Sequence, residues 1–321
     1  MTIAMAEEPL SQTPLSARLN AETGEHDDGL SAFAGVRPRL FGIAYRMLGS
    51  AAEAEDIVQD VWVRWQSTNR SVVQDPPAFL AKTTTRLCIS LVQSAHSRRE
   101  TYVGEWLPEP VDTAADPTLG AERGEALGFA VLLLLEKLSP KERAAYILRE
   151  AFDYSYRQIV DILHMDEANT RQLVSRARKR IADGRRTPVS KDEQRRLLEA
   201  FVDAAQKGDM AGQEGLFAED VVSYSDGGGI VRAARVPVSG RERVARFIAA
   251  ASHFWKGVTL AWVETNGQAA LLVSRDGVPV ALTTIDASAQ GIDQIMWIMR
   301  PSKLAAMSMA RVTGARQNRQ P

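Results

Sequence analysis

The first hundred residues show apolar side chains at the spacing of α-helices. The apolar positions recur every three or four residues over 30–49, over 50–65 and over 78–99, and a polar stretch at 69–77 separates the last two segments. Three packed helices are the simplest structure that buries these stripes. The predicted core positions are Phe33, Val36, Leu40, Ile43, Ala44, Met47, Ile57, Val61, Trp65, Phe79, Leu80, Leu87, Leu91 and Val92.

Residues 138–181 predict three more helices, separated by two sharp breaks. Ser139 and Ser155 each stand three residues before a Glu or Gln, which is the spacing of a capping box. Asp166 can cap the third helix. Short helices, a tight turn and a cationic last helix are typical of a helix-turn-helix. The apolar stripe of the last helix consists of Thr170, Leu173, Val174, Ala177 and Ile181.

The opposite side of this last helix is polar and largely cationic. Arg can bond guanine edges with two hydrogen bonds, Gln can pair with adenine, and Arg or Lys can neutralise phosphates. A solvated basic face on an ordinary surface helix would look the same, and His164 and Met165 stand where the turn often has glycine. The segment alone therefore leaves both interpretations open. The candidate DNA contacts on this helix are Arg171, Gln172, Ser175, Arg176, Arg178 and Lys179.

After residue 184 the pattern changes from helical spacing to alternation. An amphipathic helix is predicted over 193–206 and another over 241–254. Short alternating runs with turn residues between them predict strands. Helices followed by a curved antiparallel sheet indicate an α+β cone, so the fold class is multidomain, with two all-α domains before an α+β domain. The predicted strands are 221–225, 258–263, 269–274, 278–285 and 292–299.

Composition excludes several classes of protein. The 321 residues have a net charge of −1 and 25% charged residues, which is ordinary for a globular chain. The single cysteine, Cys88, cannot form an internal disulfide or a thiolate metal cluster, so we expect no metal or cofactor and a reducing cytoplasm. No run is long enough to span a membrane and no signal peptide is visible, so we expect no membrane partner. Residues 1–29 are acidic and polar, which predicts a disordered tail.

Two segments resemble a known family. RLFGIAYRMLGSAAEAEDIVQDVWVRWQ resembles region 2 of bacterial RNA polymerase sigma factors, and residues 138–181 resemble their region 4, in the order and separation of the extracytoplasmic-function type. The resemblance implies core RNA polymerase (its β′ clamp helices and β flap) and promoter DNA as partners. It implies that the helix-turn-helix recognises the upstream (−35) element, and that the loop and third helix melt and recognise the downstream (−10) element. The implied polymerase contacts are Glu53, Asp56, Gln59 and Asp60, and the implied downstream DNA contacts are Asn69, Arg70, Lys82, Arg86, Arg98 and Arg99.

A proline-rich linker at 101–121 joins the two helical domains. Apolar side chains within it indicate that it docks on another surface, and YVGEWLPEP resembles the linker of the sigma-factor group with a C-terminal SnoaL-like (NTF2-like) domain. In that group a DGGG motif faces the linker. The tail motif Asn-Pro-Asp-Lys-Leu has Arg300 and Ser302 here in place of Asn and Asp. The expected regulatory contact comprises Tyr102, Trp106, Leu107, Pro108, Asp226, Gly227, Gly228, Gly229, Pro301, Lys303 and Leu304.

The C-terminal domain has two candidate roles, catalysis and regulation. Relatives of the cone fold use a carboxylate or His as a base, and Asp226, His253 and Asp293 are the available residues. No nucleophile–base pair is visible, so we expect regulation rather than an enzyme, and a regulator that needs no separate anti-sigma factor. The alternatives are a ligand-responsive helix-turn-helix regulator that acts without the polymerase, and a SnoaL-like enzyme with a DNA-binding module. The predicted organisation is a tail (1–29), region 2 (30–100), a linker (101–121), region 4 (122–184), the SnoaL-like domain (188–304) and a flexible tail (305–321).

Overall fold

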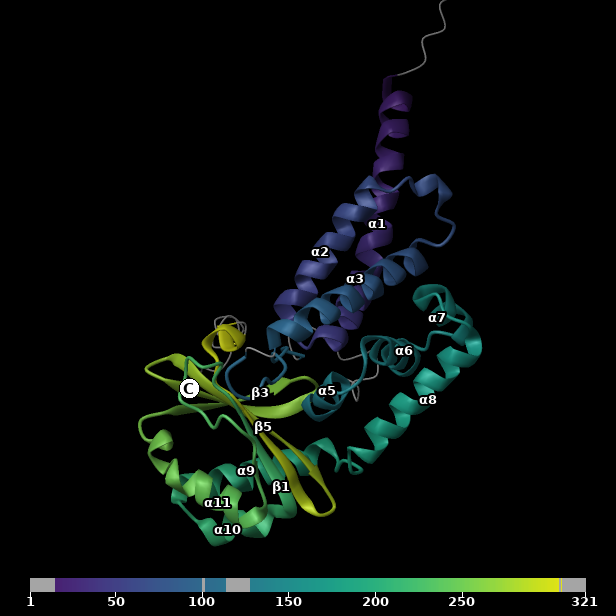
Figure 1. The fold of residues 1–321 in the computed structure, drawn as a ribbon. Helices are drawn as coiled ribbons and strands as arrows, with labels where there is room; N and C mark the ends of the chain where they lie inside the picture. Colours follow the sequence, from purple (N-terminus) through teal and green to yellow (C-terminus); the bar gives the residue numbers. More distant parts are fainter. Residues whose placement is uncertain (1–14, 100–101, 114–127, 306, 308–321) are drawn as a thin grey trace, which may run out of the picture.

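Three long helices form one end of the molecule (Figure 1). The structure is a computed structural model that describes residues 15–99, 102–113, 128–305 and 307, with side chains from residue 29 onward except those of 95–99. The helix α1 begins well before residue 30, so the backbone from residue 15 is helical where the sequence predicted a disordered tail; residues 1–14 of that tail lie outside the described residues. The helices are α1 (Leu15–Leu48), α2 (Ala51–Ser67) and α3 (Pro76–Arg99), with the short 3-10 helix η1 (Arg70–Val72) between α2 and α3.

Among the described residues that follow, the helices up to residue 183 are α5 (Phe129–Glu136), α6 (Pro140–Glu150), α7 (Tyr156–Leu163) and α8 (Glu167–Asp183). Both predicted capping boxes are present, at the starts of α6 and α7, and Asp166 caps α8. The helix α5 was not predicted, because its sequence FAVLLLLE is apolar all round and has no helical period to detect. It is buried between its neighbours, and it contacts both α1 and α8.

The two groups of helices share one continuous hydrophobic core. The Arg39 guanidinium donates a 2.7 Å hydrogen bond to the carbonyl of Phe152, and that of Arg143 donates a 2.6 Å hydrogen bond to the carbonyl of Met47. Both arginines thus bind backbone of the other group. In this arrangement the two helical domains are packed together rather than held apart by the linker.

The C-terminal part contains a six-stranded sheet in the order β2-β1-β6-β5-β4-β3. All five predicted strands are present, but the sheet is mixed rather than antiparallel, because β6 runs parallel to β1. The intervening hairpins bring the last strand back beside the first. The alternation of apolar and polar residues predicts a strand but not whether it runs parallel or antiparallel to its neighbour. The elements are α9 (Lys191–Lys207), α10 (Met210–Leu216), β1 (Phe217–Asp226), β2 (Val238–Ser239), α11 (Arg241–Ala250), η3 (Ser252–Trp255), β3 (Thr259–Thr265), β4 (Gln268–Arg275), β5 (Val278–Ser288) and β6 (Gly291–Ile298).

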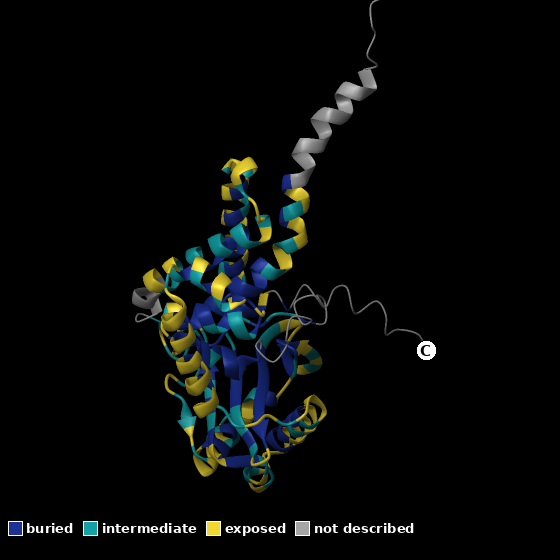
Figure 2. Cartoon of the chain, turned by 90° about the vertical axis from the view of Figure 1, so that its right-hand side faces the viewer, coloured by how far each residue is buried: buried dark blue, intermediate teal, exposed yellow. Residues whose placement is uncertain are grey.

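The central strands of the sheet are buried on both faces, as the dark blue strands in Figure 2 show, whereas the edge strands β2 and β3 are mostly exposed or partly buried. Its inner face packs against α9 and α11 through residues such as Leu271 and Val273. Its outer face packs against the linker and α5 through the alternate residues Ala270 and Leu272. Successive side chains of a strand point to opposite faces, so one strand serves two cores. The outer-face core comprises Leu107, Phe129, Ala270, Leu272, Leu282, Met296, Ile298, Leu304 and Met307.

Candidate functional site

The helix α8 presents its polar side to solvent. Every residue of its predicted apolar stripe is buried, which fixes the rotation of the helix against α6 and α7. His164 ends α7 in the left-handed conformation, with φ of 51°, and so takes the place of the expected turn glycine. The predicted DNA-contact residues Arg171, Gln172, Ser175, Arg176, Arg178 and Lys179 are all exposed and lie together on one helix.

Some of these side chains have carboxylate partners on the surface. Arg171 pairs with Glu167 at 2.6 Å, and Arg178 pairs with Glu150 at 2.7 Å. Arg176 lies 3.6 Å from Glu142, whose carboxylate is buried and also pairs with Arg180. An exposed ion pair such as that of Arg171 contributes at most about 1 kcal/mol and exchanges readily for another anion. The cationic face of α8 is therefore available to phosphates.

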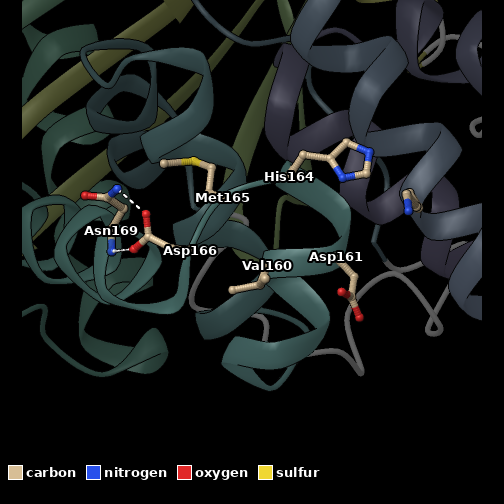
Figure 3. A pocket seen from close by; sticks show the side chains of 7 residues that line it. Val160, Asp161, His164, Met165, Asp166 and Asn169 are labelled. Carbon is tan, nitrogen blue, oxygen red and sulfur yellow. Dashed lines mark hydrogen bonds between the residues drawn. The ribbon is translucent and has the colours of Figure 1, made fainter.

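A shallow groove separates the turn of the helix-turn-helix from α3. Figure 3 shows His164, Asp161 and Asp166 along it, and Lys82 of α3 also lines it. The Arg86 Nε donates a 3.1 Å hydrogen bond to the carbonyl of Ile162, near the end of α7. Arg86, with Lys82 beyond it, lowers the pKa of the exposed His164 imidazole. One predicted downstream DNA contact, Arg86, is thus engaged by region 4 in this arrangement.

The remaining downstream candidates lie at or after the end of α2. The side-chain oxygen of Asn69 accepts a 3.2 Å hydrogen bond from the backbone N–H of Ser71 and thereby caps η1. The Arg70 guanidinium lies 5.9 Å from the ring centre of Trp65. Trp65 is buried, as the predicted core packing requires, and it donates a 2.7 Å hydrogen bond to the carbonyl of Gly29. The side chains of Arg98 and Arg99 lie outside the described residues.

The acidic face of α2 is on the surface. Asp56, Gln59 and Asp60 are exposed on successive turns, and Glu53 is partly buried near the helix start. The opposite stripe is buried in the shared core. This face is a polar, anionic strip on a rigid helix, which suits a basic protein surface better than DNA.

The linker is held by a buried carboxylate at the end of β1. Asp226 accepts a 2.5 Å hydrogen bond from the Tyr102 hydroxyl and a 3.0 Å hydrogen bond from the Leu107 backbone N–H. The Lys303 ammonium lies 2.7 Å from the same carboxylate and also donates to the carbonyl of Leu107. We call Tyr102, Leu107, Asp226 and Lys303 the Asp226 cluster. It joins the linker, β1 and the segment that follows β6, which are far apart in sequence.

Burial shapes the ionisation of this cluster. The Asp226 and Lys303 side chains are 0% and 2% exposed. Burial lowers the pKa of Lys303, and this outweighs the opposing effect of Asp226. Burial, with the hydrogen bond to Asp226, raises the pKa of Tyr102 to about 12. The phenol therefore stays protonated and donates to the carboxylate over the whole ordinary pH range.

Other predicted contact residues surround the Asp226 cluster. The Lys303 ammonium lies 4.4 Å from the ring centre of Trp106, and the Arg300 guanidinium lies 5.4 Å from that of Tyr102. The substitution of Arg300 for the usual Asn thus adds a cation–π contact. A Cβ on Gly228, whose φ is +57°, would lie 3.0 Å from the Tyr102 hydroxyl oxygen. Gly227, Leu304 and Pro108 are buried, Gly228 is partly buried, and Gly229 and Pro301 are exposed.

The structure adds a second linker contact that the sequence did not indicate. Asn266, in the turn between β3 and β4, donates a 2.6 Å hydrogen bond to the Tyr45 hydroxyl, which donates to the carbonyl of Glu109. The Val111 N–H donates to the Asn266 side chain at 3.0 Å. The Asn-Gly pair indicates a hairpin turn. Nothing in the sequence indicates that this turn would meet α1 and the linker.

The three candidate bases are separated in space. Asp226 lies at the linker contact, whereas Asp293 pairs with Arg186, which stands between α8 and α9 and also pairs with Asp220 at 2.9 Å. His253 is the one of the three that lines the cavity on the inner face. The fold therefore does not assemble these groups into a common site, and the Asp-Gly-Gly-Gly segment begins at a buried, bonded carboxylate rather than in a free turn.

Comparisons with known proteins agree with this layout. Residues 32–98 match the family described as Sigma-70 region 2, and residues 128–181 match Sigma-70, region 4. The ECF RNA polymerase sigma factor SigJ of Mycobacterium tuberculosis is 37% identical over 228 residues, which cover 68% of this chain and 72% of the relative. This chain belongs to the ECF RNA polymerase sigma factors.

Further relatives extend the similarity beyond the helical domains. The crystal structure of M. tuberculosis SigJ superposes with a TM-score of 0.70 at 31% identity, covering 86% of this chain and 98% of that one. A probable ECF sigma factor, SigI of M. tuberculosis, is 32% identical over 58% of this chain and 66% of the relative. This ECF sigma factor acts in transcription initiation, and its predicted class of two helical domains followed by an α+β domain is confirmed. No helix in the described part of the chain has the length and apolar character needed to cross a membrane.

Proposed function

We propose that this sigma factor binds core RNA polymerase through the acidic face of α2, at the β′ clamp helices. Asp56, Gln59 and Asp60 are exposed along one strip, and a rigid helix holds their spacing. Charges at the rim of an interface chiefly guide association and select partners. In the same proposal region 4 contacts the β flap and presents α8 to the upstream promoter element.

The DNA contacts in this proposal follow from exposure and charge. The six candidate side chains of α8 point to solvent, opposite its buried stripe. Arg and Lys there would bind phosphates and Arg171 or Gln172 base edges, as in other helix-turn-helix proteins. The loop at Asn69 and Arg70 and the helix α3 would contact the downstream element.

The C-terminal domain would restrain the sigma domains through the linker. The observation that supports this most directly is the Asp226 cluster, in which one buried carboxylate bonds two linker residues. Region 4 also covers Arg86 of α3, so the two promoter-binding elements are not independent in this arrangement. Release of the linker would allow them to separate. Because the restraint lies within the chain, a separate anti-sigma factor is not required by this proposal.

The test combines polymerase capture with transcription from a promoter library. Purified full-length chain is expected to bind core polymerase and to direct new start sites. Replacing Asp56 and Asp60 together with Lys should abolish capture, because it reverses the charge of the strip. The matched control is Glu55→Lys, which changes an exposed carboxylate on another side of α2 that pairs with Arg37.

A second variant tests the restraint. Asp226→Asn is expected to raise transcription by the full chain, because the linker loses its anionic anchor. Failure of both the wild-type chain and this variant to bind core polymerase would overturn the proposed function. Core binding with transcription that Asp226→Asn leaves unchanged would overturn only the regulatory part.

A further inference from the structure

The inner face of the α+β domain contains a cavity of about 420 Å³ that the proposed function does not use. Its wall is largely apolar and includes phenylalanine and tryptophan rings. The rings of Phe254 and Trp255 lie edge-on to that of Trp297, with centroids 6.3 Å and 6.1 Å from it. Ligand pockets in proteins usually measure roughly 300–1,000 Å³ and are mostly apolar. The cavity therefore has the size and lining of a small-molecule site.

The polar residues of the lining indicate the charge of the ligand. They include Arg232, His253 and the buried Ser225, and no carboxylate lines the cavity among the described residues. Arg232 is exposed and forms no ion pair with any residue that the structure describes. A guanidinium at an apolar cavity binds carboxylate or a similar acid group with two hydrogen bonds. An aromatic ring with one acid group fits both the wall and the cation.

One loop borders both the cavity and the linker. Residues 227–237 supply Arg232, Ala233 and Ala234 to the cavity. In the same loop, a Cβ on Gly229 would lie 3.0 Å from the Val103 side chain. A Cβ on Gly104 of the linker would lie 3.9 Å from the Cα of Arg235. A movement of this loop would therefore change the contacts of the linker as well as the shape of the cavity.

We propose that this cavity binds a small aromatic monoanion, with its ring against Trp255 and Trp297 and its acid group at Arg232. Loop 227–237 closes one side of the site and passes the change in occupancy to the linker. The binding claim stands independently of the sigma-factor contacts. The linker response rests on the proposed function, because it matters only if the linker restrains the sigma domains.

The test uses three probes of one ring system: naphthoate, naphthalenemethanol and naphthylmethylammonium. Calorimetric titration of the full chain should give saturable binding in the order anion, neutral alcohol, cation. Arg232→Gln should weaken naphthoate about threefold to tenfold while sparing the alcohol, as expected for loss of one exposed charge contact. The matched control is Arg235→Gln, in the same loop but outside the cavity lining, which should leave all three affinities unchanged.

A filling variant locates the site. Ala251 lines the cavity, and Ala251→Leu should abolish binding of the anion and the alcohol alike. A thermal melt checks that this variant folds; if it does not, the two arginine variants still decide the charge contact. Absence of saturable naphthoate binding overturns the site. Equal affinity for all three probes, or equal effects of Arg232→Gln and Arg235→Gln, overturns the assignment of the anion to Arg232.

Hydrogen exchange of the full chain tests the linker response. Saturating naphthoate should change exchange in residues 102–107 and in loop 227–237, and leave α8 unchanged. Calorimetric binding without any change in the linker overturns the response while leaving the site intact. Because calorimetry needs no polymerase, failure of the site is distinguishable from failure of the proposed sigma function.

Discussion

The two faces of the sheet are built from the same strands and serve different purposes. Leu271 and Leu272 are neighbours on β4, and both are fully buried. Leu271 packs with α9 and α11 in the core of the α+β domain, whereas Leu272 packs with Leu107 of the linker and Phe129 of α5. The inner face is an ordinary domain core, and the outer face is a docking surface for the sigma domains.

The difference lies in sequence separation and in charge. The partners of the inner face come from the domain itself, while the outer face joins residues far apart, such as Lys303 and Leu107, separated by 196 positions. The outer face also contains the buried ion pair of Asp226 and Lys303. A buried pair contributes little net stability but is costly to break singly. A change to either member of this pair is therefore expected to loosen the docking of the linker.

The largest effect is expected from Asp226→Asn. The change leaves the Lys303 ammonium buried without its carboxylate, and such losses cost about 3–5 kcal/mol. Hydrogen exchange of the Leu107 amide, which donates to Asp226, measures the opening free energy of the linker. The double variant Asp226→Asn with Lys303→Met removes both charges and should recover part of the loss. Equal protection in wild type and single variant would show that the ion pair does not hold the linker.

Neighbouring leucines on β4 separate the two faces directly. Leu271→Ala and Leu272→Ala should each cost about 2–5 kcal/mol, because each leaves a cavity in a packed core. Hydrogen exchange should show loosening of α9 and β4 for Leu271→Ala, and of the linker and α5 for Leu272→Ala. The same exchange pattern in both variants would mean that the faces unfold as one unit.

Alanine substitutions at two glycines with positive φ test whether the linker packs closely against Gly228. Gly228→Ala places a Cβ 2.8 Å from the Arg300 side chain at φ of +57°, whereas Gly257→Ala has φ of +66° and nothing within 4 Å. Both incur backbone strain of about 1–2 kcal/mol, but only Gly228→Ala should also lower protection of the Leu107 amide. Thermal unfolding measures the loss of stability from the strain that both variants share. Hydrogen exchange of the Leu107 amide measures the loss of linker protection that only Gly228→Ala should cause. Equal linker protection in the two variants would contradict the contact.

The smallest effect is a pH dependence confined to the outer face. The folded pKa of Tyr102 is raised from 10.0 to about 12, so its contribution is fully present below pH 10 and is lost as pH rises through about 12. The lowered pKa of Lys303 has the opposite effect on stability: it makes the folded state more stable as pH rises, but only up to the ordinary lysine pKa of 10.5. Linker docking should therefore weaken between about pH 10.5 and 12. The difference in tyrosinate absorbance between wild type and Tyr102→Phe, followed against pH, gives the titration of Tyr102. A midpoint near the ordinary tyrosine pKa of 10.0 would refute the predicted shift.

Much of the helical fold could be predicted from the sequence because its signals are local. The capping boxes at Ser139 and Ser155 and the stripe that ends at Ile181 depend on spacing within one helix. The candidate DNA residues of α8 were exposed as expected for the same reason. The uniformly apolar α5 and the short β2 had no such period and were missed.

The sequence by itself determined the helices with an amphipathic or capping signal, the five longer strands and which face of α8 is polar, since these follow from periodicity and capping. Only the tertiary structure decided that β6 lies parallel to β1, that Asn266 meets Tyr45, and that Arg86 is covered by region 4. These contacts join residues more than seventy positions apart. They depend on how whole elements pack, because the closure of long chain segments leaves no local trace in the sequence.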